Sequence, residues 1–166
     1  MRLKDHLAAG HSEPPMKVIH AAASALGQRT ITHAVATYEV TTQPKEDNSP
    51  EETLAQWDCM MLTEDALVIV TASRPGSEWY LGSEWDEIRE DGASITAELI
   101  PLREVVGCSV IGVRSFGPTN WLARWDVRLR DGRKPPVPWP TRHRQETQRR
   151  HEELATALAD RLLSHA

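Results

Sequence analysis

The sequence predicts an α+β domain that is mostly β, with a short N-terminal helix, antiparallel strands and one C-terminal amphipathic helix. Three observations support this fold class. The chain has 166 residues, which is enough for one domain with a self-sufficient core. Short β-branched runs separated by turn residues follow one another between residues 54 and 132. Leucines recur at helical spacing near the C-terminus, at positions Leu154, Leu158 and Leu162.

The N-terminal region is expected to form a helix, a strand and a polar loop. Residues 15–26 begin with a proline suited to a first helical turn and end before a glycine, which predicts a short helix. Residues 30–40 alternate and are rich in β-branched side chains, which predicts a strand. Residues 41–53 hold two prolines and little to bury, which predicts a loop or linker. We therefore divide the chain into an N-terminal appendage, residues 1–53, and a domain, residues 54–166. The appendage is either an added helix and strand or a partly disordered arm.

A meander of short strands is predicted for the domain. Two apolar runs joined by Thr63, Glu64 and Asp65 have the spacing of a tight hairpin. A strand is expected where Gly-Ser-Glu-Trp occurs twice, placing Trp79 and Trp85 on one face. Further strands are expected over residues 94–102, 104–113 and 121–130, the last two joined by a turn at 117–120.

The final predicted strand alternates most cleanly. It would place Trp121 and Trp125 on the face toward the core and arginines on the opposite face. Residues 133–140 contain four prolines, which confines them to an edge strand or an extended segment. The last predicted element is a helix from about residue 141, with Thr141 as its N-cap. Each buried leucine of its stripe contributes about 2 kcal/mol, so this helix is expected to dock on the sheet.

The order of these elements resembles the pleckstrin-homology-like domains of bacteria and their GRAM-type relatives. The resemblance is carried by residues 62–71, 100–105, 127–132 and 153 onward. It implies a bent antiparallel barrel of about seven strands, closed at one end by the C-terminal helix. Members of that family bind inositol phospholipids through basic residues in the first hairpin loop, or bind peptides, proteins or themselves. Here that loop is Thr63-Glu64-Asp65, which is acidic and disfavours the usual phospholipid mode.

Charge is segregated along the chain. Residues 1–102 hold 7 basic and 17 acidic side chains, whereas residues 103–166 hold 12 basic and 7 acidic ones. Two interpretations remain open: the two parts attract each other within one domain, or the basic part faces a partner.

Candidate binding residues follow from this pattern. Arg124, Arg128 and Arg130, with Arg133 nearby, could hold phosphate or carboxylate groups by forked hydrogen bonds, or could form a solvated face paired with acidic segments. Trp139, between prolines in the predicted edge segment, is expected to face a partner. Because an edge strand can pair with another chain, residues 133–140 predict homodimerisation.

Several classes of function find no support in the sequence. We find no nucleophile elbow, phosphate loop or dinucleotide fingerprint, and no Cys/His cluster with metal spacing, so neither catalysis, nor a cofactor, nor a metal is expected. Cys59 and Cys108 stand in apolar runs and are expected to be free, buried thiols. The net charge of −5 does not favour nucleic-acid binding. Asp5 and Glu13 interrupt any apolar signal segment, so cytoplasmic residence is expected.

Two function hypotheses result. The first is a non-catalytic cytoplasmic binding module for a protein partner, with self-association as one form of it. The alternative is a peripheral membrane module that binds anionic lipid through the arginine-rich face.

Overall fold

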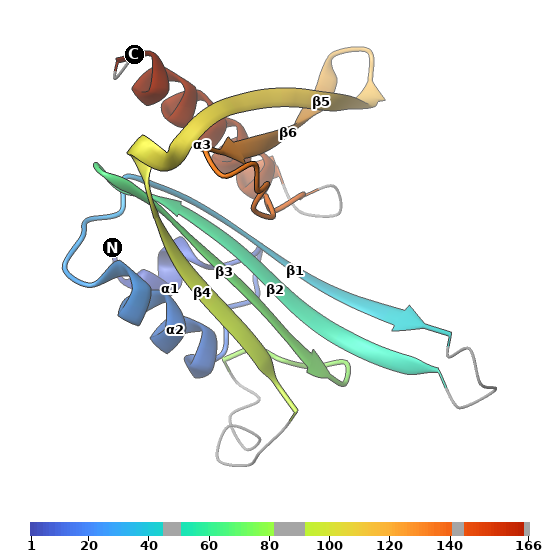
Figure 1. The fold of residues 1–166 in the computed structure, drawn as a ribbon. Coiled ribbons are helices and arrows are strands. Elements are labelled where there is room, and N and C mark those ends of the chain that lie inside the picture. Colours follow the sequence, from blue (N-terminus) through green and yellow to red (C-terminus); the bar gives the residue numbers. More distant parts are fainter. Residues whose placement is uncertain (45–50, 82–91, 141–144, 165–166) are drawn as a thin grey trace.

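The main body of the protein is a four-stranded antiparallel sheet (Figure 1). A computed structural model describes residues 1–44, 51–81, 92–140 and 145–164. The strands lie in chain order, β1-β2-β3-β4, and each pairs with the next. Their bounds are β1 (His33–Gln43), β2 (Glu52–Leu62), β3 (Ala66–Pro75) and β4 (Ser94–Pro101).

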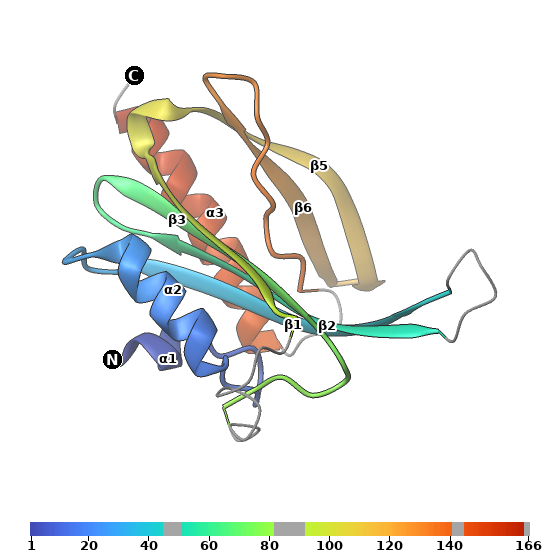
Figure 2. The same ribbon diagram turned by 60° about the horizontal axis from the view of Figure 1, so that its bottom comes forward.

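Helices and a second sheet cover this sheet on its two sides (Figures 1 and 2). On one side lie the short α1 (Leu3–His6) and α2 (Met16–Leu26). A 3-10 turn, Leu102–Glu104, follows β4 and leads to a two-stranded hairpin. The hairpin and the C-terminal helix lie on the other side: β5 (Val105–Gly117), β6 (Asn120–Leu129) and α3 (Gln145–Ser164).

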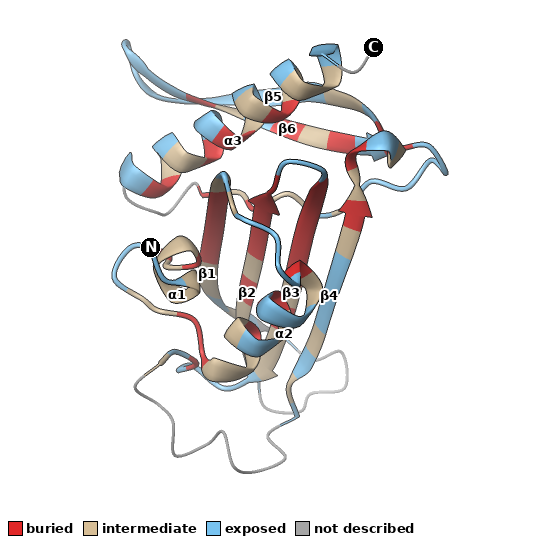
Figure 3. Ribbon diagram, turned by 90° about the vertical axis from the view of Figure 1, so that its left-hand side faces the viewer, coloured by how far each residue is buried: buried red, intermediate tan, exposed pale blue. Residues whose placement is uncertain are grey.

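The main sheet is buried on both faces because its strands are apolar at successive positions. Trp57, Cys59 and Met61 point to the core beneath α2, whereas Met60 and Leu62 point to the core shared with α3 and the hairpin. Figure 3 shows this burial near the start of β1, the end of β2 and the start of β3. Two separate hydrophobic clusters therefore hold the layers together.

The predicted elements are largely confirmed. The helix over residues 15–26 is α2, the strand over 30–40 is β1, and the predicted hairpin is formed by β2 and β3. The predicted loop over 41–53 is shorter, because β1 and β2 continue toward each other in register from Val40↔Ala55 to Gln43↔Glu52. Cross-strand pairing holds these polar residues in strands although they have little to bury; residues 45–50 lie outside the described residues. Residues 1–53 thus supply α1, α2 and β1, and the division of the chain at residue 53 remains a prediction.

The expectation of a closed barrel of about seven strands is not met. The described residues form six strands in two sheets, and β5 pairs with β6 without joining the main sheet. Two forms were predicted for residues 133–140, an edge strand or an extended segment, and the edge strand does not form. A backbone bond from Leu129 N–H to the Arg133 carbonyl, at 2.9 Å, connects their start to β6. Their four prolines lack the N–H groups that a further strand would need to close the barrel.

The tryptophan pair of the two Gly-Ser-Glu-Trp segments is also placed differently. Trp79 lies in the loop after β3 and not in a strand, and it is buried. The Nε1–H of Trp57 donates to the carbonyl of Trp79 at 2.7 Å, and this bond holds the loop against the core. Trp85 and Thr141, the predicted N-cap, lie outside the described residues.

The C-terminal helix docks as its leucine stripe predicts. Leu154 and Leu158 are fully buried, and Leu162 is half-buried. Thr147 and His151 extend the buried stripe toward the start of the helix, whereas Leu163 is 78% exposed. Among the described helices, none combines the length and apolar character needed to cross a membrane.

Candidate interaction surface

Apolar side chains are exposed mainly on the β5–β6 hairpin. Among the described residues, ten large hydrophobic side chains are exposed, and the hairpin carries six of them. Trp121, Val110 and Val113 are each more than half exposed. Exposed apolar side chains that gather on one element commonly mark an interaction site, whereas singly scattered ones do not. We call the six residues the hairpin patch: Val106, Val110, Ile111, Val113, Phe116 and Trp121.

Three of these residues occupy β-bulges in β5. The pairing with β6 shifts between Val105 and Gly107, between Val110 and Gly112, and between Ser115 and Gly117. The extra residues at the three shifts are Val106, Ile111 and Phe116. Bulges bend a strand and disrupt its ladder, so β5 curves, and its free edge is a poor template for regular strand pairing (Figure 1).

The bulges follow a five-residue pattern that our sequence analysis missed. Each extra apolar residue immediately precedes a glycine, at 106–107, 111–112 and 116–117. A glycine inside a strand often marks a bulge, so this repeat was a readable signal. The prediction of a plain strand over residues 104–113 takes no account of these bulges or of the exposure of its apolar residues.

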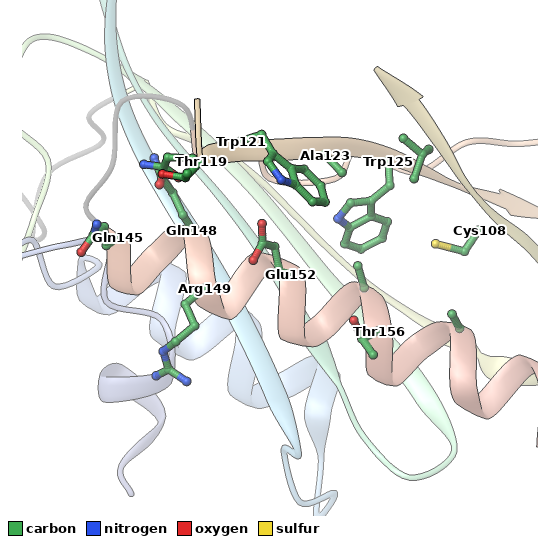
Figure 4. A pocket seen from close by; sticks show the side chains of 14 residues that line it. Cys108, Thr119, Trp121, Ala123, Trp125, Gln145, Gln148, Arg149, Glu152 and Thr156 are labelled. Atoms are coloured by element: carbon green, nitrogen blue, oxygen red, sulfur yellow. The ribbon is translucent and has the colours of Figure 1, made fainter. Parts of the chain in front are cut away.

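A groove of about 700 Å³ separates the hairpin from α3 (Figure 4). This volume lies within the range of roughly 300–1,000 Å³ that is typical of ligand sites. Small or apolar side chains form part of its lining, and polar side chains of α3 form another part. The first group includes Val110, Ala123, Trp125, Ala155 and Ala159, and the second includes Gln145, Gln148, Arg149 and Glu152.

Trp121 lies along this groove, between Thr119 and Trp125 (Figure 4). It lies on the same side of β6 as Trp125, as predicted, but it is 58% exposed whereas Trp125 is 4% exposed. The expectation that Trp121 is core was therefore wrong. The first turns of α3 place polar side chains, among them Gln148 and Glu152, across the groove from it, and these leave the indole uncovered (Figure 4).

Two polar groups of the groove have no partner among the described residues. The indole Nε1–H of Trp125 is buried without an acceptor. The carboxylate of Glu152 is exposed, and no described cation lies within ion-pair distance of it. A buried donor that lacks an acceptor costs about 1–3 kcal/mol, so Trp125 favours a ligand that brings an acceptor.

His151 fixes the hairpin over the helix. It is fully buried on α3, its ring centroid is 5.3 Å from that of Trp125 and 5.7 Å from that of Trp139, and its Nε2 lies 3.2 Å from the Ala123 carbonyl. Since a carbonyl only accepts, Nε2 carries the proton and donates. Burial lowers the pKa of His151 below its usual value near 6.5, and the bond to Ala123 acts in the opposite direction.

The predicted arginines share the other face of β6. Arg124, Arg128 and Arg130 are all exposed, and Arg114 joins them from β5 through its pairing with Leu122. The guanidinium of Arg124 lies 5.9 Å from the centre of the Trp139 ring, and that of Arg128 lies across Gly107. We call Arg114, Arg124 and Arg128 the arginine face.

The remaining predicted residues are engaged within the chain. Arg133 pairs with Asp131 at 2.7 Å and with Glu98 at 2.9 Å, and Arg130 lies 4.0 Å from Glu104. These carboxylates raise the pKa of Arg133. Trp139 is half-buried against His151 between two buried prolines, so it supports the hairpin as well as reaching the surface.

A second, larger groove of about 1,040 Å³ lies at the opposite end of the hairpin. Its charged residues are mostly paired: Arg29 with Asp65 at 3.0 Å, and Arg103 and Arg130 with Glu104. The smaller groove is the better candidate because it is lined by Trp125, whose buried Nε1–H lacks an acceptor among the described residues, and by the exposed indole of Trp121. In the described part of the chain, no three His, Cys, Asp or Glu side chains gather as they would around a metal ion.

Comparison with known proteins gives no further guide to function. The chain matches no family model, and no curated protein and no solved structure is similar to it. Function has therefore to be inferred from the geometry of this chain.

Proposed function

We propose that this protein is a non-catalytic binding module that engages a protein partner through the hairpin patch and the adjoining groove. The observation that carries the proposal is the gathering of six exposed apolar side chains on one hairpin, next to a groove with an unpartnered buried donor. Aromatic anchors beside a pocket and a polar rim are the usual anatomy of a protein interface.

Kinship with pleckstrin-homology-like domains and residence in the cytoplasm are parts of this proposal. The first is supported by the order of an antiparallel sheet, a separate hairpin and a C-terminal helix. The second is supported by Cys59 and Cys108, which are both free thiols.

Site-specific photo-crosslinking tests the proposal. A photo-reactive phenylalanine analogue is introduced at Val113 of the hairpin patch, and in a control variant at Ser24, which is exposed on α2 beyond the opposite face of the sheet. We expect protein adducts, to another protein or to a second copy, after irradiation in an extract of the native cells at position 113 only. Equal adducts at both positions, or none at 113, would refute the proposal.

Binding to an anionic membrane is the alternative, and the arginine face favours it. Among the described residues, no carboxylate lies within ion-pair distance of Arg114, Arg124 or Arg128. Co-sedimentation with neutral and anionic vesicles at low and physiological salt separates the two functions. The protein-binding proposal predicts no salt-sensitive sedimentation, whereas lipid binding would require sedimentation that salt weakens and that Arg124→Glu/Arg128→Glu abolishes.

A further inference from the structure

Two complementary half-sites lie at the hairpin. The first is the groove between the hairpin and α3, where the carboxylate of Glu152, which has no ion-pair partner among the described residues, lies near the exposed indole of Trp121 (Figure 4). A carboxylate beside an aromatic ring suits a cationic side chain, since both attract it. This half-site accepts a cation together with an apolar group.

The second half-site lies near the end of the same hairpin. The guanidinium of Arg114 is exposed and stacks 5.5 Å from the centre of the Phe116 ring, which is itself 39% exposed. No described carboxylate lies within ion-pair distance of Arg114. This half-site therefore presents a cation together with an aromatic ring.

The register of the hairpin keeps the two half-sites apart within one chain. Arg114 pairs with Leu122, whereas Trp121 pairs with Ser115. Neighbouring strand positions point to opposite faces, so Arg114 projects away from the face that carries Trp121 and the groove. The two charges are thus available to another molecule.

We infer that the partner is a second copy of this chain, with the hairpin end of each copy in the groove of the other. In a two-fold dimer each subunit contributes both halves of the contact, and each copy of this chain carries one of each, the groove and the hairpin end. In such a dimer, Arg114 of each copy meets Glu152 of the other, and Phe116 packs on the partner's Trp121. A backbone carbonyl at the incoming hairpin end supplies the acceptor that the Trp125 Nε1–H lacks.

The bulges decide the manner of this association. Regular pairing between two β5 edges would need an unbroken ladder, but bulges at Val106, Ile111 and Phe116 interrupt it. Docking through side chains remains, with a charge pair that sets the orientation. This inference rests on the proposed function, because it uses the same surface.

A charge exchange tests it by sedimentation equilibrium of the full chain at micromolar concentrations. The wild type is expected to dimerise. Arg114→Glu and Glu152→Arg each place like charges together at both contacts, so each alone weakens dimerisation by about tenfold or more. An equimolar mixture of the two variants restores opposite charges at both contacts and is expected to dimerise as heterodimers, close to the wild-type level.

Glu64→Arg is the matched control, because Glu64 is an exposed carboxylate on the turn between β2 and β3, outside the groove. It is expected to dimerise like the wild type, and circular dichroism should show all variants folded. A monomeric wild type, or a mixture that stays monomeric when the wild type dimerises, would overturn the inference. If a monomeric chain still gives adducts to another protein at position 113, the binding module stands without self-association; if it gives none, both proposals fail.

Discussion

At the scale of single residues, His151 joins three separate parts of the chain. Its ring contacts Trp125 of the hairpin and Trp139 of the proline-rich segment, and its Nε2–H donates to the Ala123 carbonyl. Because the ring is fully buried, the folded protein favours the neutral form, and the pKa of His151 is lowered. The histidine therefore makes the attachment of the hairpin sensitive to acid.

The lowered pKa predicts a loss of stability in mild acid. In the unfolded chain the histidine takes up a proton below about pH 6.5, whereas in the folded protein it resists protonation to a lower pH. Its contribution to stability is therefore complete above about pH 6.5 and is lost as the pH falls below that value. Urea unfolding between about pH 7.5 and pH 5 should show the free energy of unfolding of the wild type falling more steeply than that of His151→Gln. Parallel curves for the two proteins would show that His151 does not carry this effect.

At the scale of elements, α3 is held by a narrow stripe of buried residues. Leu154 and Leu158 are fully buried among side chains of the main sheet and the hairpin, whereas Leu163 is 78% exposed. The charged remainder of the helix carries exposed pairs such as Arg149 with Glu146, which contribute little to stability because water screens them. Packing of the leucine stripe, and not surface charge, sets the stability of this element.

A pair of leucine substitutions measures that packing. Leu154→Ala removes buried methyl groups and leaves a cavity, so it is expected to lower the free energy of unfolding by about 2–5 kcal/mol. Leu163→Ala removes the same groups from an exposed position and should change stability by less than about 0.5 kcal/mol. Urea unfolding of both variants provides the comparison, and a similar loss in the two would contradict the placement of α3.

The hairpin shows where sequence reasoning succeeded and where it stopped. Alternation in residues 121–130 correctly placed Trp125 toward the core and the arginines on the opposite face. Alternation does not show how much of the face that carries Trp121 and Trp125 is covered by another element. The prediction therefore placed Trp121 in the core. The exposure of Trp121 depends on the polar first turns of α3, which only tertiary packing brings opposite it.

At the scale of the whole molecule, local patterns predicted the helices and strands but not whether the strands close into a barrel. Turn residues and β-branched runs identify β2, β3 and β6, because these signals act over a few neighbouring residues. Whether six strands form one barrel or two sheets depends on pairing between strands that are distant in sequence. Here β5 pairs with β6 and not with the main sheet, and the prolines of residues 133–140 lack the N–H groups that a further strand would need. The groove and its unpartnered groups arise from that open arrangement, so the candidate site could not be read before the fold was known.

The open arrangement also has a functional consequence. The main sheet packs against α2 on one face and against α3 and the hairpin on the other, so each face has a hydrophobic cluster formed within the chain. Trp125, Val127 and Leu129 of the hairpin are buried in the cluster shared with α3, whereas the residues of the hairpin patch remain exposed. The molecule thus combines a self-sufficient body with one apolar projection that a partner can cover.

Photo-crosslinking from position 113, compared with position 24, tests most directly whether the hairpin patch is the interaction surface. If the hairpin is the interaction surface, protein adducts form at 113 and not at 24, and Trp121→Ser in the same chain reduces them by removing the neighbouring anchor. If adducts form equally at both positions, or if Trp121→Ser leaves them unchanged, the hairpin patch is not the surface through which this protein acts.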